Sequence, residues 1–274
     1  MNRLPTLFLS HGAPSFALEP GIAGSRLTAL GRALRRPEAV LVISPHWMTP
    51  LPRVGMTARP STIHDFGGFA PALYEIVYPV TGHPTLAQRT VEVLHDAGWR
   101  AQADEQRGLD HGAWVPMLHL YPRADVPVFQ LSLPSALDSD SAWAFGEALA
   151  PLATEGVLIV GSGSLTHNLY EFRAGHGREE AYAAEFAGWI REAVLAGDAK
   201  RLRQALTLAP HAKRAHPSTE HFLPLLVAAG AAGASLPATV VEGGITHGVL
   251  SMDSFVFGDM HLAETVRTAH DAPA

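Results

Sequence analysis

Short hydrophobic runs alternate along the chain with longer stretches in which hydrophobic residues recur at helical spacing. The short runs predict buried strands, and the longer stretches predict amphipathic helices. We expect strands at 6–9, 39–44, 127–133, 156–161, 239–242 and 250–257, and helices around 24–35, 84–97, 140–154, 179–195, 198–207 and 221–230. This alternation predicts an α/β fold whose central sheet, mostly parallel or mixed, is flanked by helices.

No stretch rich in Pro, Gly or Ser divides the chain, and no internal repeat is present. We therefore expect one domain over 1–274, with a core of about 5–258 and a frayed tail at 262–274. The longest irregular stretch lies at about 58–82. Loops of that length within a compact domain are more often functional than idle.

Histidines follow three of the expected strands. His11 comes after the first strand, His46 after the second, and His167 after the strand that ends in a Gly-Ser-Gly-Ser segment. Ligands of open α/β sheets bind beyond the carboxyl ends of the strands, so these side chains are expected to converge there. Their spacing matches no compact zinc motif, and a single histidine near a strand end is more often a surface or capping residue than a ligand. For the three together, the repeated placement makes the two explanations about equal.

A fourth candidate histidine lies near the start of the last expected helix. Pro224 is tolerated only in a first helical turn, which places His221 close to that helix start. His216 lies five positions earlier, a spacing that does not share one helical face, so the two are not expected to act as a pair.

Two further segments carry candidate chemistry. Residues 62–69 combine His64 and Asp65 with two aromatic residues and a Gly-Gly pair, a mixture that suits a lid or a substrate wall. The alternative is that Asp65 caps backbone amides in a turn. Asp110 is expected to cap a helix whose first turn holds His111.

Composition changes the picture in one respect, because the 274 residues include 15 His and no Cys. Disulfides, thiolate zinc sites, iron–sulfur clusters and cysteine nucleophiles are thereby excluded. Any metal must be held by nitrogen and oxygen, and imidazole suits iron(II), zinc, copper and nickel. A histidine site with open coordination positions would be catalytic rather than structural.

Charge and hydropathy exclude several partners. With 20 Lys+Arg and 26 Asp+Glu the net charge is −6, which argues against binding to nucleic acid or to an anionic membrane. No apolar run reaches the ~18 residues that a membrane span needs. The apolar stretch at the N-terminus is too short for a signal peptide. We therefore expect a soluble, cytoplasmic protein.

Together, the histidine segments resemble the class III extradiol ring-cleavage dioxygenases, in particular the branch typified by DOPA 4,5-dioxygenase. The segments that carry the resemblance are Ser10–Pro14, Ser44–Trp47, Ile63–Phe69, Asp110–Gly112, Thr166–Leu169 and Glu220–Leu226. The resemblance implies a single α/β domain with one divalent metal ion, Fe(II) for ring cleavage or Zn(II) as isolated. It also implies a catechol substrate, such as DOPA, that is cleaved with O2.

The resemblance also assigns roles to residues. It implies that His11, His46 and His221 are metal ligands, His221 standing where better-known relatives use a glutamate. His167 is implied as acid/base or fourth ligand, and His111 as a second active-site histidine near the substrate. Candidate substrate contacts are Asp65, His64 and Trp47; candidate aromatic walls, for which core packing is equally expected, are Trp47, Phe66, Phe69 and Trp114.

Two other functions remain compatible with the same residues. A zinc hydrolase would use the histidines to activate water. A non-catalytic, metal-containing binding protein would need no acid/base residue, and the presence of the full histidine set argues against it. The oligomeric state, monomer or homodimer, stays open because the Ala-rich stretch at 228–234 suits packing either within or between subunits.

Overall fold

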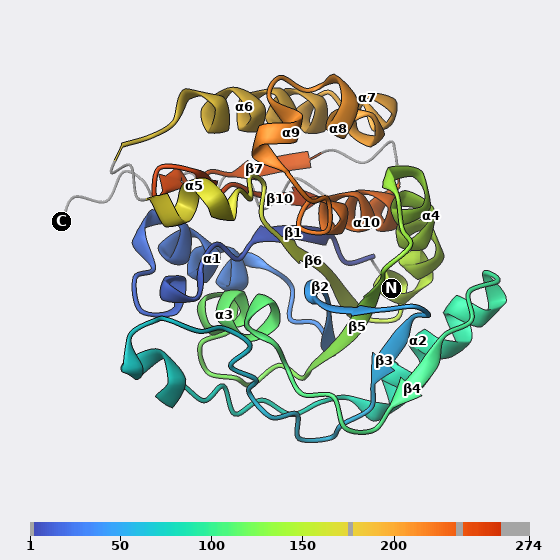
Figure 1. The fold of residues 1–274 in the computed structure, drawn as a ribbon. Coiled ribbons are helices and arrows are strands. Elements are labelled where there is room, and N and C mark those ends of the chain that lie inside the picture. The colour runs from blue at the N-terminus through green and yellow to red at the C-terminus, as the bar shows by residue number, and fades with distance from the viewer. Residues whose placement is uncertain (1–2, 175–177, 234–237, 259–274) are drawn as a thin grey trace.

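The computed structural model describes residues 3–174, 178–233 and 238–258, and at its centre is an eight-stranded sheet (Figure 1). The strand order is β4-β3-β5-β2-β6-β1-β10-β7. The four central strands, β5, β2, β6 and β1, run parallel, whereas β3, β10 and β7 add antiparallel pairings. The sheet is therefore mixed, as the sequence predicts. Its strands are β1 (Thr6–Ser10), β2 (Ala39–Thr49), β3 (Arg53–Gly55), β4 (Gln102–Asp104), β5 (Val128–Pro134), β6 (Val157–Gly163), β7 (Ala238–Val241) and β10 (Ser254–Phe257).

Helices cover both faces of this sheet (Figure 1). Successive side chains of a strand point to opposite faces, so Leu41 and Ile43 join the core under α2, α4 and α10, while Val40 and Val42 join the core under α1 and α3. An outer layer of α6 to α9 lies beyond α10 (Figure 1). The helices are α1 (Gly21–Ala33), α2 (Pro84–Asp96), α3 (His111–Leu120), α4 (Ser139–Leu149), α5 (Leu169–Ala174), α6 (Ala181–Leu195), α7 (Ala199–Arg203), α8 (Ala205–Leu208), α9 (Ala212–Ala215) and α10 (Leu223–Ala232), with short 3₁₀ turns at Pro14–Ala17, Pro71–Glu75 and Ala150–Thr154.

Some predicted boundaries are wrong. The strand expected to end at Ser44 continues to Thr49, and its pairing with β5 shifts register between Ser44 and Met48, which accommodates Pro45. The strand expected at 250–257 is two strands, β9 (Leu250–Ser251), which pairs with β8 (Ile245–Thr246), and β10. The helix expected at 198–207 is split into α7 and α8, and the one at 140–154 ends as a 3₁₀ turn that contains Pro151.

Helix α10 lies against β6 at unusually short range. A Cβ on Gly161 would stand 2.0 Å from the carbonyl oxygen of Pro224, and one on Gly163 would stand 2.3 Å from that of His221. Glycine therefore lets the first turn of α10 rest directly on the strand. All ten residues of α10 are buried, so the Ala-rich stretch over 228–232 packs within the subunit. None of the helices in the described ranges has the length and apolar content to cross a membrane.

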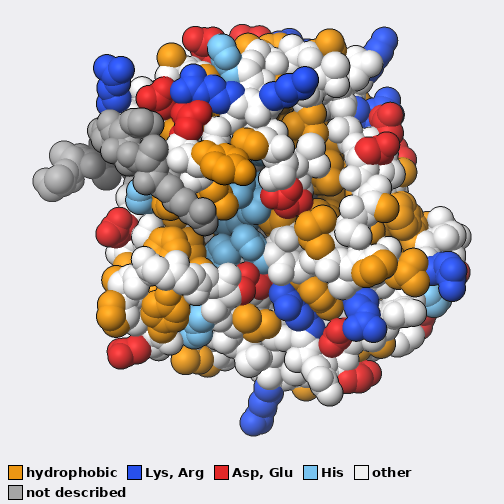
Figure 2. All heavy atoms as spheres, viewed as in Figure 1, with side chains coloured by type: hydrophobic (Ala, Val, Ile, Leu, Met, Phe, Trp, Pro, Cys, Tyr) orange, Lys and Arg blue, Asp and Glu red, His pale blue; other side chains and the backbone are white. Residues whose placement is uncertain are grey.

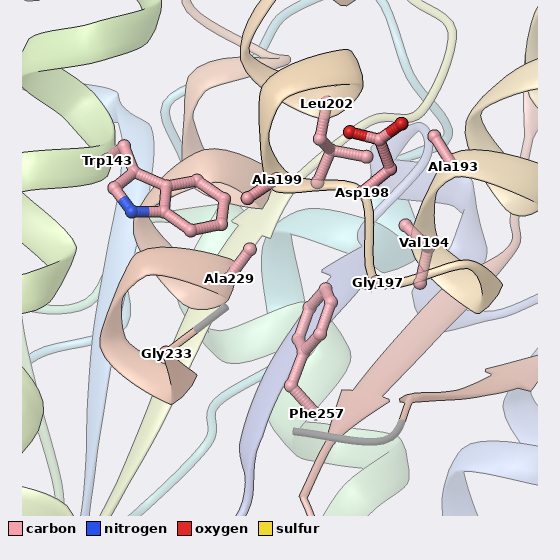
Figure 3. A pocket seen from close by; sticks show the side chains of 10 residues that line it. All are labelled: Trp143, Ala193, Val194, Gly197, Asp198, Ala199, Leu202, Ala229, Gly233 and Phe257. Atoms are coloured by element: carbon pink, nitrogen blue, oxygen red, sulfur yellow. The ribbon is translucent and has the colours of Figure 1, made fainter. Parts of the chain in front are cut away.

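A small apolar cavity separates α4, α7 and α10 from β10 (Figure 3). Its volume of about 20 Å³ holds little more than one water molecule. The charged residue that lines it, Asp198, already accepts a hydrogen bond from the Arg201 amide as the cap of α7. The described residues of this cavity therefore offer no free polar group for chemistry. The tail expected at 262–274 lies outside the described residues.

Candidate metal centre

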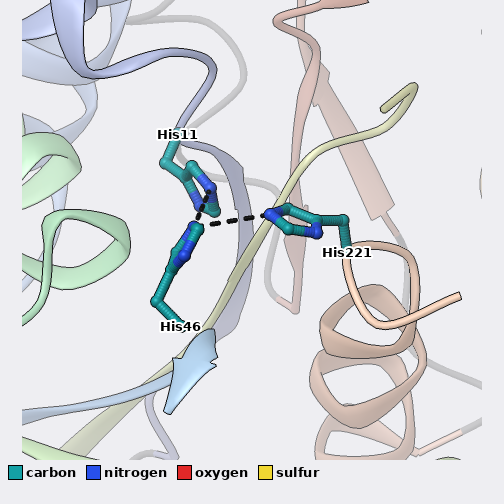
Figure 4. Close-up of side chains that lie close together, drawn as sticks. All are labelled: His11, His46 and His221. Carbon is teal, nitrogen blue, oxygen red and sulfur yellow. Dashed lines mark hydrogen bonds between the residues drawn. The ribbon is translucent and has the colours of Figure 1, made fainter. Parts of the chain in front are cut away.

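Three histidines from distant parts of the sequence meet at the carboxyl edge of the central strands. His11 directly follows β1, His46 lies within β2, and His221 precedes α10 by two residues. Because β1, β6 and β2 run parallel, their carboxyl ends lie at one edge, as the sequence predicts. The Nε2 atom of His46 lies 3.2 Å from that of His11 and 3.4 Å from that of His221 (Figure 4). The three nitrogens lie within 4.8 Å of one another.

The Nδ1 atom of His11 is held by a buried serine. It lies 3.0 Å from the hydroxyl oxygen of Ser162, which in turn donates its own proton to the carbonyl of Gly112. The helical donor for that carbonyl would be the amide of residue 116, but Pro116 has none, so the serine hydroxyl replaces it. Since its proton is used there, Ser162 accepts from Nδ1–H of His11. The Nε2 atom of His11 therefore carries a lone pair.

Carboxylates lie beside Nδ1 of the other two rings. The Nδ1 atom of His221 lies 3.0 Å from a carboxylate oxygen of Glu220, which can only accept, so Nδ1 carries the proton and Nε2 carries a lone pair. The Nδ1 atom of His46 lies 3.6 Å from a carboxylate oxygen of Asp65, too far for a hydrogen bond, and the negative charge favours the same tautomer by electrostatic attraction. This is the arrangement of carboxylate and imidazole that metal-binding histidines adopt.

Burial keeps these three rings neutral. It lowers the pKa of His46 from 6.5 to about 3, with the neighbouring His111 adding to the effect. Burial likewise holds the pKa of His11 and that of His221 well below 6.5, and the other histidines of the cluster lower both further. Neutral imidazole is the form that binds a metal.

The geometry fits a divalent cation. Three lone pairs that face one another at 3.2 and 3.4 Å repel unless a positive charge lies among them. Two nitrogens bound to one zinc-like ion at about 2.0–2.1 Å in tetrahedral geometry lie about 3.3–3.4 Å apart. The two separations from Nε2 of His46 therefore match those of nitrogens that share one metal ion.

His111 and Asp65 form a pair beside this group. The Oδ1 atom of Asp65 accepts from both the backbone amide and Nδ1 of His111, at 2.9 and 3.0 Å. Burial tends to raise the pKa of Asp65, but its hydrogen bonds and proximity to His111 outweigh this and lower it to about 2. Asp65 thus caps the first amide of α3, a role that the sequence assigned to Asp110.

The Asp110 side chain has a different function from the one expected. It makes no cap hydrogen bond although the residue stands at the N-cap position. Fully buried, it lies 2.7 Å from Nη2 of Arg107 and accepts from Gln130 at 2.8 Å. Arg107 also donates to the backbone carbonyl of His46, at 3.4 Å, and lies over the ring of Trp47. This network braces the backbone on both sides of the histidine cluster.

His167 is placed differently from the other histidines. Its ring stacks on that of His221, with centroids 3.5 Å apart and planes 8° from parallel. Its ring nitrogens group with Glu220 and His221, not with the set formed by His11, His46 and His221. Burial lowers the pKa of His167 to about 4, so the ring is neutral near pH 7. This arrangement suits an acid/base better than a fourth ligand.

The cluster lies in a cavity of about 520 Å³, and its histidines are visible in a hollow between apolar side chains (Figure 2). His11, His46, His111, His167 and His221 all line this cavity, together with Asp65, Phe66 and Phe69. Three side chains that the sequence suggested as substrate contacts or aromatic walls are not among the residues that line this cavity. Trp47 packs under Arg107, His64 bonds to the carbonyl of Ile76, and the fully buried Trp114 donates to the carbonyl of Ile63.

Sequence reasoning missed Ser162 and Glu220. Both stand next to residues that were singled out, Ser162 in the Gly-Ser-Gly-Ser segment and Glu220 immediately before His221. The requirement that a ligand histidine have a partner on its second nitrogen could have drawn attention to them. It could not have shown which histidine each one serves.

Comparisons with known proteins give the family. A model described as the catalytic LigB subunit of aromatic ring-opening dioxygenase matches residues 8–258. A protein of Beta vulgaris named 4,5-DOPA dioxygenase extradiol is 41% identical over 93% of this chain and 97% of its own length. One of the same name from Escherichia coli K12 is 38% identical, over 94% and 96% of the two chains.

A solved structure extends the likeness to three dimensions. The crystal structure of an uncharacterized protein from Escherichia coli K12 superposes with a TM-score of 0.77 at 32% identity, covering 93% of this chain and all of the other. The matches support neither the zinc hydrolase nor the non-catalytic alternative. This chain therefore belongs to the LigB family of aromatic ring-opening dioxygenases and is a metal-dependent extradiol dioxygenase.

Proposed function

We propose that this enzyme opens the ring of a catechol with O2 at an iron(II) ion held by His11, His46 and His221. The observation that carries the proposal is the convergence of the Nε2 atoms of these three histidines in one cavity. Relatives named for DOPA make DOPA the first catechol to test. When bound, iron(II) supplies Lewis acidity toward both catechol oxygens and the one-electron chemistry that O2 requires.

An all-nitrogen ligand set suits zinc as well as iron(II). Zinc has no redox chemistry, so it would occupy the site without supporting reaction with O2. We therefore propose that iron(II) is the active metal and that zinc competes for the same three histidines. Equal O2 uptake by the zinc-loaded and the iron-loaded protein would contradict this assignment.

His167 is proposed as the general base for the second catechol hydroxyl. Its ring lines the cavity and is neutral near pH 7, so a lone pair is available to take that proton. Stacking against His221 holds the ring beside the ligand group without placing it among the ligands. The same ring can later return the proton to an oxygen of the opened product.

His111 is proposed as the second polar contact to the substrate. Asp65 holds the proton of this ring on Nδ1, which leaves Nε2 as a hydrogen-bond acceptor for a catechol O–H. Asp65 is then a positioning residue, because its carboxylate is already engaged with His111 and lies beside His46. Its hydrogen bonds orient the ring of His111, and its second oxygen lies 3.6 Å from Nδ1 of His46.

The test is O2 uptake by protein loaded with iron(II) under anaerobic conditions and then mixed with catechols. His167→Ala should lower kcat by about 10²- to 10⁴-fold while metal content stays near that of the wild type. His211→Ala is the control, because His211 pairs with Glu185 on the exposed surface. Iron and catechol binding without O2 uptake would refute the dioxygenase, and loss of metal from His167→Ala would make His167 a ligand.

A further inference from the structure

A second cavity lies at the opposite end of α3 from the candidate metal centre. Its volume is about 430 Å³, within the range of small-molecule sites. Helix α3 begins at His111, beside the metal centre, and ends at Leu120, which lines this second cavity. The other residues that line it come from the end of α1 and from the segments that lead into β2 and β5. Because β2 and β5 run parallel, this cavity lies at the amino edge of the central strands, and the metal centre lies at the carboxyl edge.

Three guanidinium groups and one carboxylate line the second cavity. Arg36 and Arg123 both contact Oδ2 of Asp125, at 3.0 and 2.9 Å. Arg32, which is exposed in the last turn of α1, forms no ion pair within the described ranges. Three arginines against one aspartate leave this lining with an excess of two positive charges, in a chain whose net charge is −6. The second cavity therefore attracts anions although the protein as a whole is acidic.

The same lining contains a buried hydroxyl that lacks a partner. Tyr121 is 7% exposed, and its hydroxyl oxygen makes no hydrogen bond to any described residue. Burial raises the pKa of Tyr121, so this hydroxyl stays protonated at neutral pH and is available as a donor. An unpaired buried polar group is costly, and a ligand oxygen that accepts the proton removes that cost.

The ends of α1 and α3 account for only part of this arrangement. Carbonyl groups at the carboxyl end of a helix attract cations, which favours a basic residue such as Arg32 in the last turn of α1. Two carbonyls at the end of α3 already have donors, because Thr28 donates to that of His119 and Tyr78 to that of Tyr121. Helix ends therefore explain neither the excess of charge nor the unpaired hydroxyl.

We propose that the second cavity binds a small organic phosphate ester in its dianionic form. Two negative charges match the excess of positive charge, and guanidinium groups present the paired N–H donors that phosphate oxygens accept. The hydroxyl of Tyr121 donates to a further oxygen of the same group. The apolar side chains of Leu34, Leu120 and Pro122, which also line the cavity, contact the organic part of the ester. This site is independent of the catechol chemistry at the metal centre.

The experiment is titration calorimetry with phenyl phosphate on the zinc-loaded protein at about pH 8, where this ester is a dianion. Benzenesulfonate is the matched monoanion, and succinate is a dianion with two carboxylates. We expect phenyl phosphate to bind at least about tenfold more tightly than either of them. Equal or tighter binding of benzenesulfonate would overturn the charge match, and equal or tighter binding of succinate would overturn the assignment to phosphate.

The variant Arg32→Gln tests the location of the site, because it leaves no described carboxylate without a partner. It should weaken the binding of phenyl phosphate at least about tenfold. Arg53→Gln is the matched control, since it also removes one positive charge but on β3, where Arg53 pairs with Asp104 outside the lining. Its affinity for phenyl phosphate should stay within about twofold of the wild type. Unchanged binding in Arg32→Gln would mean that the anion binds elsewhere, the metal ion included, and would overturn the proposal.

The variant Tyr121→Phe gives a readout that does not depend on charge. It removes a buried hydroxyl that has no partner, so the Tm of the ligand-free variant should equal or exceed that of the wild type. Its affinity for phenyl phosphate should fall about tenfold. Tyr78→Phe is the control for stability and should lower the Tm, because the hydroxyl of Tyr78 donates to the Tyr121 carbonyl. A lower Tm in ligand-free Tyr121→Phe, or wild-type affinity for phenyl phosphate, would contradict the role given to this hydroxyl.

Discussion

Replacement of Ser162 by alanine tests two roles of one hydroxyl, in the stability of the fold and in the binding of metal by His11. In the wild type this hydroxyl donates to the Gly112 carbonyl and accepts from Nδ1 of His11. The side chain is fully buried, so Ser162→Ala leaves both groups without a partner and without water. Each of the two unpaired groups costs about 1–3 kcal/mol, which gives an expected loss of about 2–6 kcal/mol in the free energy of unfolding.

Metal affinity should fall in the same variant. Without its acceptor, the proton of His11 is no longer confined to Nδ1, and the lone pair on Nε2 is no longer assured. Loss of such a partner typically lowers metal affinity by about 10- to 100-fold. Chelator competition with zinc, which avoids oxidation, measures this change. Urea unfolding of the metal-free protein measures stability independently.

A second substitution divides the two effects. Pro116→Ala restores the backbone amide that the Gly112 carbonyl lacks in α3. The double variant Ser162→Ala/Pro116→Ala should therefore regain about 1 kcal/mol or more of stability, but its metal affinity should stay low. The control is Ser132→Ala, because Ser132 is a buried serine on β5 that accepts a hydrogen bond from the Arg53 amide. This variant should lose stability and keep the metal affinity of the wild type. Wild-type metal affinity in Ser162→Ala would refute the role assigned to the hydroxyl.

Three further outcomes are expected. Gly163→Ala should cost about 1–3 kcal/mol and lower metal content, because its Cβ would displace the His221 carbonyl; calorimetry and metal analysis check this. Burial lowers the pKa of His216 to about 4, whereas the same side chain in the unfolded chain titrates near 6.5. As the pH falls from 6.5 towards 4, the unfolded chain is therefore protonated before the folded one, and the free energy of unfolding falls by up to about 3 kcal/mol. Urea titrations of metal-free His216→Gln should show a shallower fall. Arg107→Ala should destabilise by about 3–5 kcal/mol in the same assay, because it leaves the Asp110 carboxylate buried without its cation.

The convergence of the histidines in the candidate metal centre was predictable from a simple regularity. His11 and His46 each follow a hydrophobic strand, and parallel strands bring their carboxyl ends to one edge. The placement of His221 followed from Pro224, which marks the first turn of a helix. These inferences depend only on local pattern and on the geometry common to all parallel sheets.

Other features depend on packing that local pattern does not encode. Strands β3 and β4 have three residues each, too few for a periodic signal. Trp47 and His64 stand beside site residues in sequence, yet their side chains turn to Arg107 and to the Ile76 carbonyl. Proximity in sequence does not determine which side of the backbone a side chain occupies. Asp65 was recognised as polar and near the site, but its bond to His111 joins segments that only the fold brings together.

The proposed ligand set would have a consequence for the stability of the protein in a cell. His11 directly follows the first strand and His221 comes just before α10, so an ion bound to the proposed ligands would join two segments that are about 210 residues apart in the chain. An unfolded chain cannot offer these nitrogens together, and the free energy of metal binding is therefore added to that of folding. Free metal at about 1,000 times its Kd would contribute about 4 kcal/mol. Resistance to proteolysis, and with it the amount of enzyme, would then follow the supply of metal.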